Sequence, residues 1–216
     1  MGQRFSAWFM NPFCKSINNN VKNEKALLFD SMTQLRETLD RDLVICEIGA
    51  RSGVNYKHYP PRSKLICVEP NQYSRSYLEE NIRTTNPSLT LKDFVCGFAE
   101  SMPGIDNECV DAVVCTLVLC CVKNQKEVLS EVLRILRPDG QFYFMEHVAD
   151  QPGTFRRKMQ NTFTPAWKLL TGNCHLNNNA RAVLQDAGFK SVRTTDFTYR
   201  SMLWLIRPWM FGVATK

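Results

Sequence analysis

The chain has 216 residues, of which 44% are hydrophobic and 22% are charged, and its formal net charge is +6. This length suits one sizeable hydrophobic core and is short for two domains. The basic residues form no Lys/Arg block, so we expect no nucleic-acid partner. The nine cysteines include no Cys-x-x-Cys pair and no Cys/His cluster with zinc-finger spacing. We therefore expect no metal, reduced thiols and an intracellular, cytosol-facing protein.

Residues 1–21 form a segment of their own ahead of the domain. Met1-Gly2-Gln3-Arg4-Phe5-Ser6 fits the N-myristoylation pattern, and aromatic side chains and Cys14 follow it. One interpretation is peripheral membrane contact through residues 2–15, with the aromatic residues or an acylated Cys14 as the second signal that a single acyl chain needs. The other is a helix that packs on the domain. The apolar run is too short to span a bilayer.

Residues 22–216 alternate between apolar runs typical of buried strands and segments with helical periodicity. We predict a single Rossmann-like α/β domain with a mostly parallel seven-stranded sheet and helices on both faces. The expected helices are 22–40, a short one from 55, 74–83, 124–136 and 179–187, and the expected strands are 43–47, 64–69, 89–95, 110–119, 141–145, 191–199 and 209–214. Residues 150–178 interrupt the alternation and are expected to form a lid or substrate wall.

A glycine turn after the first strand is the most informative motif. The strand ends in Glu47, and Gly49 and Gly53 follow. Glycine lets the backbone turn sharply and lets a ligand lie against bare amides at a helix N-terminus. Twenty residues after Gly49 the second strand ends in Glu69, where an acid can accept both hydroxyls of a ribose. This arrangement is typical of a nucleoside-binding α/β unit.

The spacing of the glycines separates two cofactor classes. A nicotinamide or flavin site uses Gly-x-Gly-x-x-Gly, and the third glycine of that pattern is missing here. An acid before the first glycine suits a ligand that carries an ammonium group. Glu47-x-Gly49-x-x-x-Gly53 resembles motif I of the class I methyltransferases that use S-adenosylmethionine.

Two further segments are candidates for the cofactor site. The turn after the third strand holds Phe98 and Ala99, which can pack on a base, and Glu100, which can accept from an exocyclic amine. The alternative is a surface turn with an incidental acid. Thr116, Leu117 and Val118 end the most hydrophobic strand, where ligands bind in open α/β sheets, although core packing selects the same residue types.

Longer strings resemble one family, the methyltransferase-like seven family of membrane-associated alkyl thiol methyltransferases. The resemblance is carried by residues 53–61, 113–120, 122–125, 136–138 and 142–148 and extends from about Phe5 to Lys216. It implies a seven-stranded sheet whose last strand is antiparallel, S-adenosylmethionine as cofactor, and methyl transfer to aliphatic thiols at endoplasmic reticulum or lipid droplet membranes. On this basis Glu47 is expected to meet the cofactor's amino group, and Gly49, Ala50, Arg51 and Gly53 its methionine portion, with Asn55 as a further cofactor-binding candidate. Glu69 is expected at the ribose, and Pro70 and Asn71 are further cofactor-binding candidates.

The chain departs from the family pattern at Arg51 and at the N-terminus. Arg51 stands where the family has the middle glycine of Gly-Cys-Gly-Thr-Gly. A side chain there either strains a position of positive φ and intrudes on the methionine moiety, or swings out and pairs with the cofactor carboxylate. We expect no counterpart of the family's long hydrophobic anchor helix in these N-terminal residues, and a lipid on Gly2 would be one substitute for it.

His147 is the candidate general base, with Glu146 as the group that orients it, because both end a strand at the cofactor edge. The alternative is that His147 only packs beside the site. A thiol is already partly ionised at neutral pH, so a strong base is not obligatory. The rival functions are methylation of carbon or oxygen in a lipophilic molecule such as a quinone, a catalytically silent membrane-attached protein, and a nicotinamide oxidoreductase.

Overall fold

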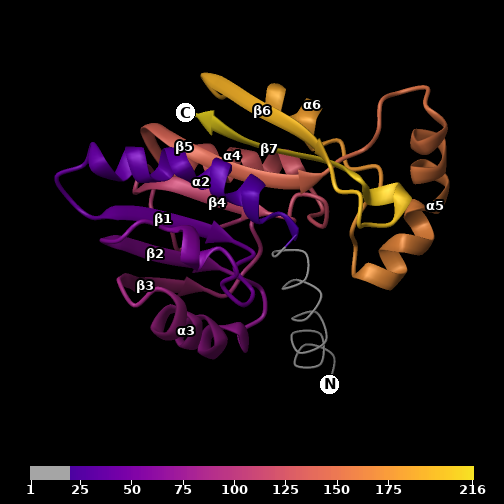
Figure 1. The fold of residues 1–216 in the computed structure, drawn as a ribbon. Coiled ribbons are helices and arrows are strands. Elements are labelled where there is room, and N and C mark those ends of the chain that lie inside the picture. The colour runs from indigo at the N-terminus through magenta and orange to yellow at the C-terminus, as the bar shows by residue number, and fades with distance from the viewer. Residues whose placement is uncertain (1–19) are drawn as a thin grey trace.

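The computed structural model of the chain describes residues 20–216 (Figure 1). The predicted acylation pattern and the predicted membrane contact of residues 2–15 lie outside the described residues. Within residues 20–216, no helix is long and apolar enough to cross a membrane.

Seven strands form one sheet in the order β3-β2-β1-β4-β5-β7-β6. Strand β7 runs antiparallel to both of its neighbours, β5 and β6, and the remaining pairs are parallel. The sheet predicted from the sequence is confirmed, including its antiparallel last strand. The strands are β1 Leu43–Ile48, β2 Ser63–Val68, β3 Leu89–Val95, β4 Val110–Thr116, β5 Leu136–His147, β6 Ser191–Thr198 and β7 Pro208–Thr215.

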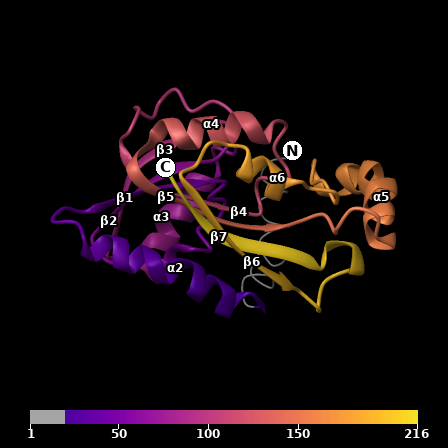
Figure 2. The same cartoon turned by 90° about the horizontal axis from the view of Figure 1, so that it is seen from above.

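Helices cover both faces of the sheet, and Figure 2 shows α2 and α4 on opposite sides of it. Helices α2 and α3 belong to one apolar cluster and helices α4 and α6 to the other. The helices are α2 Lys22–Glu37, α3 Ser74–Thr85, α4 Gln125–Ile135, α5 Phe155–Thr171 and α6 Ala180–Gln185, with short 3₁₀ turns η1 Tyr56–His58 and η2 Trp204–Ile206.

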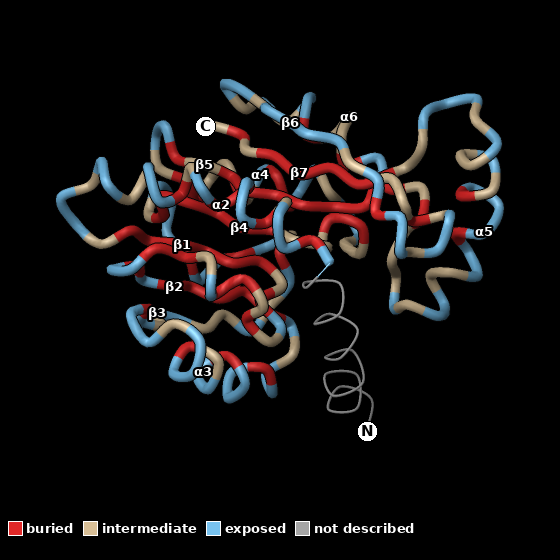
Figure 3. Tube along the Cα trace, in the orientation of Figure 1, coloured by how far each residue is buried: buried red, intermediate tan, exposed pale blue. Residues whose placement is uncertain are grey.

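The central strands are buried on both faces, as their unbroken apolar runs predict. In β1, Val44 and Cys46 point into the cluster under α4, while Leu43 and Ile45 point into the cluster under α2. Every residue of β1 is buried, and Figure 3 shows the same for most of β4. The two layers therefore hold the ends of β1 and β4 at fixed positions.

Two predicted strand boundaries are wrong by three residues or more, for local reasons. The fourth strand was expected to continue to residue 119, but β4 ends at Thr116 because Leu117 adopts a φ of +58°. The fifth strand was expected to begin at 141, but β5 begins at Leu136. The expected turn at 137–140 survives as an irregularity inside β5, where the register with β4 shifts and Asp139 has a φ of +59°.

The predicted insertion at 150–178 contains the 17-residue helix α5, which stands beyond the end of β5 (Figure 1). The Thr154 side chain caps its start by accepting from the Arg157 amide, and Gly172 ends it in the left-handed conformation. Helix α5 contacts η2, so two segments far apart in the sequence meet at the carboxyl edge of the sheet.

Candidate active site

A cavity opens at the carboxyl ends of β1, β4 and β5, the edge at which open α/β sheets bind ligands. The sequence predicted seven of its lining residues. These are Glu47, Gly49, Ala50, Arg51, Thr116, Leu117 and His147. The other walls come from α2, the loop after β4, α5 and the segments on either side of η2. Their residues include Lys25, Cys120, Cys121, Trp167, Cys174, Met202, Ile206 and Trp209.

Asn55 organises a buried polar network at one end of this cavity. Its Nδ2 donates to Glu47 Oε1 at 2.7 Å and to Thr116 Oγ1 at 3.0 Å. Its Oδ1 accepts from Lys25 Nζ at 2.6 Å. Asn55 is fully buried and does not line the cavity, whereas Glu47 does, so Asn55 holds the Glu47 side chain in position without itself facing the cavity.

Glu47 is an ionisable group held out of water. Burial raises the pKa of its carboxyl to about 7, against the hydrogen bond from Asn55, the nearby Tyr59 hydroxyl and the charge of Lys25, which lower it. Glu47 Oε2 and the Tyr59 hydroxyl are both buried, and neither makes a hydrogen bond of regular geometry among the described residues. The same end of the cavity is lined by the basic side chains of Lys25 and Arg51. A carboxylate beside basic groups is complementary to a ligand that carries both an ammonium and a carboxylate group.

The glycine turn has the conformation that the motif predicts. Gly49 and Gly53 have φ values of +68° and +71°. A Cβ atom on Gly49 would collide with the side chain of Val118, and one on Gly53 would collide with the ring of Tyr56. Arg51, in the middle of the turn, has a φ of +45°, which costs a non-glycine residue about 1 kcal/mol. Its side chain is exposed at the cavity.

The predicted ribose acid lies beside this turn. Glu69 is buried, and its carboxylate accepts from the Arg51 amide at 3.2 Å and from the Asn71 amide at 3.1 Å. These bonds fix the carboxylate against the backbone of the glycine turn. Glu69, Pro70 and Asn71 are not among the residues that line the cavity.

The predicted adenine segment also lies outside the cavity lining. Phe98 is 64% exposed and Ala99 is buried. Glu100 accepts from the backbone amide of Lys123 at 2.8 Å, a contact that joins the turn after β3 to the segment before α4. The roles of these three residues at a base remain predictions.

Glu146 and His147 point to opposite sides of β5, since consecutive strand residues alternate. The Glu146 carboxylate accepts from the amides of Val118 and Leu119 at 2.8 and 2.9 Å and from Cys120 at 3.3 Å. No hydrogen bond joins Glu146 to His147 in the described part of the chain, so its expected role of orienting His147 is not supported. Glu146 instead fixes the loop that follows β4.

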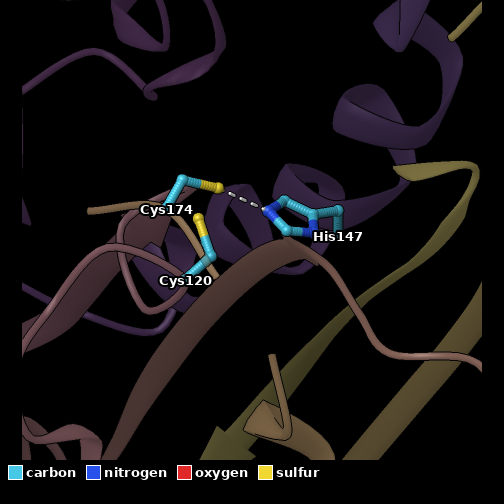
Figure 4. A group of neighbouring side chains, drawn as sticks. All are labelled: Cys120, His147 and Cys174. Carbon is cyan, nitrogen blue, oxygen red and sulfur yellow. Dashed lines mark hydrogen bonds between the residues drawn. The ribbon is translucent and has the colours of Figure 1, made fainter. Parts of the chain in front are cut away.

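His147 contacts a cysteine. Its Nε2 lies 3.1 Å from Cys174 Sγ, and its Nδ1 is buried without a partner among residues 20–216. The thiols of Cys120 and Cys121 and the His147 ring hold the pKa of the Cys174 thiol well below its ordinary value. One donor atom each from Cys120, His147 and Cys174 lies within 4.8 Å of the others (Figure 4).

Sequence reasoning missed Lys25 and the cysteine cluster. Lys25 could have been found, because it follows Val21 by four residues and precedes Leu28 by three, on the apolar face of α2. A lysine on that stripe signals a buried charge with a partner. The cysteines gave no such signal, since they come from distant segments.

Comparison with known proteins identifies the family. The sequence profile described as "Methyltransferase domain" matches residues 46–144. Human thiol S-methyltransferase TMT1A is 35% identical over 99% of this chain and 87% of its own length. Thiol S-methyltransferase TMT1B of Rattus norvegicus is 32% identical over 91% of this chain and 80% of its own length. The chain belongs to the thiol S-methyltransferase TMT1 family. The resemblance found in the sequence motifs is confirmed.

Solved structures agree on the class I methyltransferase fold. The CurJ carbon methyltransferase superposes with a TM-score of 0.63 at 20% identity, over 88% of this chain and 53% of that chain. The [4+2]-cyclase SpnF gives a TM-score of 0.62 at 15% identity, over 87% of this chain and 80% of that chain. Because a cyclase and a carbon methyltransferase share it, the fold does not specify the reaction.

Proposed function

We propose that this protein is an S-adenosylmethionine-dependent methyltransferase whose acceptor is the sulfur of a small aliphatic thiol. The family relationship supports the thiol acceptor, because the TMT1A and TMT1B relatives are named thiol S-methyltransferases. The observation that carries the cofactor is the buried Glu47 carboxylate, which lines the cavity and whose Oε2 makes no hydrogen bond of regular geometry among the described residues. A buried acceptor of this kind is costly unless a ligand satisfies it.

The methionine portion of the cofactor fits the residues that line the cavity, and the ribose and adenine contacts follow from the sequence motifs. Glu47 would bind its ammonium group, and Arg51 with Lys25 would face its carboxylate. The turn from Gly49 to Gly53 would hold the rest of the methionine portion. Glu69, with Pro70 and Asn71, would bind the ribose, and Phe98, Ala99 and Glu100 would bind the adenine. The wall between the methionine half and the nucleoside half of the cofactor would be formed by Thr116, Leu117 and Val118.

The reaction asks the protein mainly for alignment and for exclusion of water. When bound, the cofactor supplies an electrophilic methyl group on a sulfonium. The cavity lining also includes the apolar side chains of Trp167, Ile206 and Trp209, which suit an alkyl chain. The His147 ring centroid lies 6.5 Å from that of Trp209, and His147 would either accept the thiol proton as a general base or pack beside the acceptor.

The direct test is turnover of S-adenosylmethionine with an alkyl thiol and, in parallel, with a quinol. We expect the methylated thiol as product and at least about tenfold weaker binding of S-adenosylhomocysteine by Glu47→Ala, since a charge-assisted contact is lost. Methylation of the quinol alone would favour the carbon or oxygen methyltransferase. Absence of cofactor binding would indicate the catalytically silent alternative.

We further propose peripheral attachment to the cytosolic face of the endoplasmic reticulum or lipid droplets through residues 2–15, aided by α5. Leu169 and Leu170 of α5 are 89% and 82% exposed, and Leu203 before η2 is 65% exposed. Exposed apolar groups of this size mark interaction surfaces. We expect Gly2→Ala and the pair Leu169→Gln, Leu170→Gln to reduce co-sedimentation with phospholipid vesicles. Tyr77→Gln, on the distant and half-exposed α3 surface, is the matched control and should bind vesicles like the parent chain.

A further inference from the structure

We propose that Cys120, His147 and Cys174 form a zinc site whose fourth coordination position opens into the active-site cavity and receives the acceptor thiol. The inference rests on the proposed function for the identity of that acceptor, and on the geometry of the side chains for the metal.

The three ligands converge from separate parts of the fold. Cys120 follows β4, His147 ends β5 and Cys174 follows α5, and Figure 4 shows their sulfur and nitrogen atoms pointing toward one another. Their donor atoms lie within 4.8 Å of one another, and the closest pair, His147 Nε2 and Cys174 Sγ, is 3.1 Å apart. Cys120 and His147 are buried. Donor atoms this close can take the corners of one tetrahedron with small side-chain adjustments.

The ligand segments are held together by hydrogen bonds that do not involve the donor atoms. The His175 amide donates to the Cys120 carbonyl at 2.8 Å, and Asn178 Nδ2 donates to the His147 carbonyl at 2.9 Å. Asn173 Nδ2 also donates to the Cys121 carbonyl at 2.7 Å. The loop that carries Cys174 is thereby fixed to both other ligand segments. These hydrogen bonds hold the three metal-binding side chains in fixed positions, as metal sites require.

The ligand types select the metal and the kind of site. Two thiolates and one imidazole favour zinc over calcium or magnesium, which take oxygen ligands. Two cysteines and a histidine with an open position are a known set for catalytic zinc, whereas structural sites use four protein ligands. Within residues 20–216, Cys121 is the candidate to close the site, since its Sγ lies 3.5 Å from Cys120 Sγ. It is not part of the group in which all donor atoms lie within 4.8 Å.

The position of the cluster gives the site its role. Cys120, His147 and Cys174 line the same cavity as Glu47 and Gly49, which serve the cofactor in the proposed function. A thiol that binds the open position loses its proton to solvent and stays bound as a thiolate, because a zinc-coordinated thiol is deprotonated. Methyl transfer would form a bond from the methyl carbon to that sulfur and break the bond of the same carbon to the cofactor sulfonium, which leaves as S-adenosylhomocysteine. The product is a neutral thioether, which is a weaker ligand and would leave the metal.

The first test measures metal without turnover. Full-length protein is incubated with zinc under reducing conditions and dialysed, and the zinc content is determined by mass spectrometry. We expect one zinc ion per chain, and a content lower by about tenfold or more in Cys120→Ser and Cys174→Ser. Cys96→Ser, on an exposed cysteine outside the cluster, is the matched control and should keep its zinc. No retained zinc in the parent chain, or unchanged zinc in both cluster variants, would overturn the proposal.

The second test examines the open position. In cobalt-substituted protein, an added alkyl thiol should strengthen the sulfur-to-cobalt charge-transfer absorption, and its S-methyl thioether should leave the spectrum unchanged. Cys121→Ser should behave like the parent chain. If the thiol has no effect and Cys121→Ser loses the metal, the site is a closed structural one and the proposal is wrong. Calorimetric titration with S-adenosylhomocysteine separates the two ideas: cofactor binding without zinc contradicts only the metal site, and zinc without cofactor binding contradicts the proposed function.

Discussion

At the scale of single residues, Asn55 determines the charged end of the cavity. Its carboxamide contacts Glu47, Thr116 and Lys25 and is fully buried. One amide thus joins the end of β1, the end of β4 and helix α2. Glu47 keeps one oxygen engaged in this network and one oxygen without a hydrogen bond of regular geometry among the described residues. The carboxylate is held in one orientation before any ligand arrives, which lowers the ordering cost of binding.

The pKa of Glu47, about 7 in the ligand-free protein, predicts the pH dependence of cofactor affinity. Below pH 7 the carboxyl is protonated and must lose its proton to pair with an ammonium, so affinity should fall about tenfold per pH unit. Above pH 7 it should level off. Calorimetric titration with S-adenosylhomocysteine from pH 5.5 to 7.5 measures this slope. Glu47→Gln should bind weakly at every pH, and a slope that persists in this variant would assign the titration to another group.

Arg51 makes opposite contributions to stability and to binding. Its φ of +45° is accessible to glycine, so Arg51→Gly should raise the free energy of unfolding in urea by up to about 1 kcal/mol. The same change removes a charge at the cavity and should weaken the binding of S-adenosylhomocysteine about three- to tenfold.

The matched control is Arg62→Gly, at an exposed arginine with a φ of +59° that does not line the cavity. It should stabilise the protein similarly and leave ligand affinity unchanged. If Arg51→Gly bound the cofactor more tightly than the parent chain, the arginine would be an obstruction and the proposed contact with the carboxylate would be wrong.

At the scale of elements, α5 forms one wall of the cavity although it stands apart from the sheet. It supplies Trp167 and is anchored through Gln160, which is fully buried. The Gln160 side chain accepts from the Asp150 amide at 2.8 Å and donates to the Leu205 carbonyl at 2.8 Å. One side chain therefore connects α5 to the chain after β5 and to η2.

Gln160→Leu should loosen this wall while leaving the sheet intact. The substitution leaves buried backbone groups without hydrogen-bond partners, and each such group costs about 1–3 kcal/mol. We expect faster amide hydrogen exchange in residues 155–171 and a higher KM for the acceptor thiol, with little change in cofactor affinity. Gln151→Leu, at an exposed glutamine of the same segment, is the control. Equal exchange in both variants would contradict the anchoring role.

At the scale of the whole molecule, the antiparallel insertion of β7 between β5 and β6 determines where the last segment of the chain lies. Strand β7 pairs with β5 from Thr215 to Trp209 and delivers Trp209 and the preceding η2 to the cavity. Gly212 lies on β7, the middle strand of three, where it pairs with Phe144 of β5 on one side and Thr194 of β6 on the other.

Gly212→Ala should be strongly destabilising for a steric reason. A Cβ at this position would collide with the Arg193 carbonyl of β6 and lie 2.8 Å from the Phe144 ring. We expect a loss of about 1–3 kcal/mol in urea unfolding, the usual cost of overpacking. Gly97→Ala, where an added Cβ meets nothing within 4 Å, should be nearly neutral. Equal stability of the two variants would show that the strands adjust freely.

The sequence by itself determined the order of the elements and most of the cofactor edge. Apolar runs such as Leu43–Ile48 are typical of strands buried on both faces, and the Glu47 and Gly49 motif sits at the end of such a run. The glycine spacing depends on backbone conformation, which is a local property, so Arg51 could be recognised as a strained position. The resemblance to the methyltransferase-like seven family added the prediction that the last strand is antiparallel.

Tertiary structure alone decided which side chains share the cavity. Cys120, His147 and Cys174 lie 27 residues apart at each step, and no local period relates a strand end to loops after other elements. The direction of Glu146 was equally hidden, because the partners of a buried carboxylate depend on how the loop after β4 folds back. Side chains from distant segments meet only once the strand order of the sheet and the position of α5 are fixed. Both are properties of packing rather than of sequence spacing.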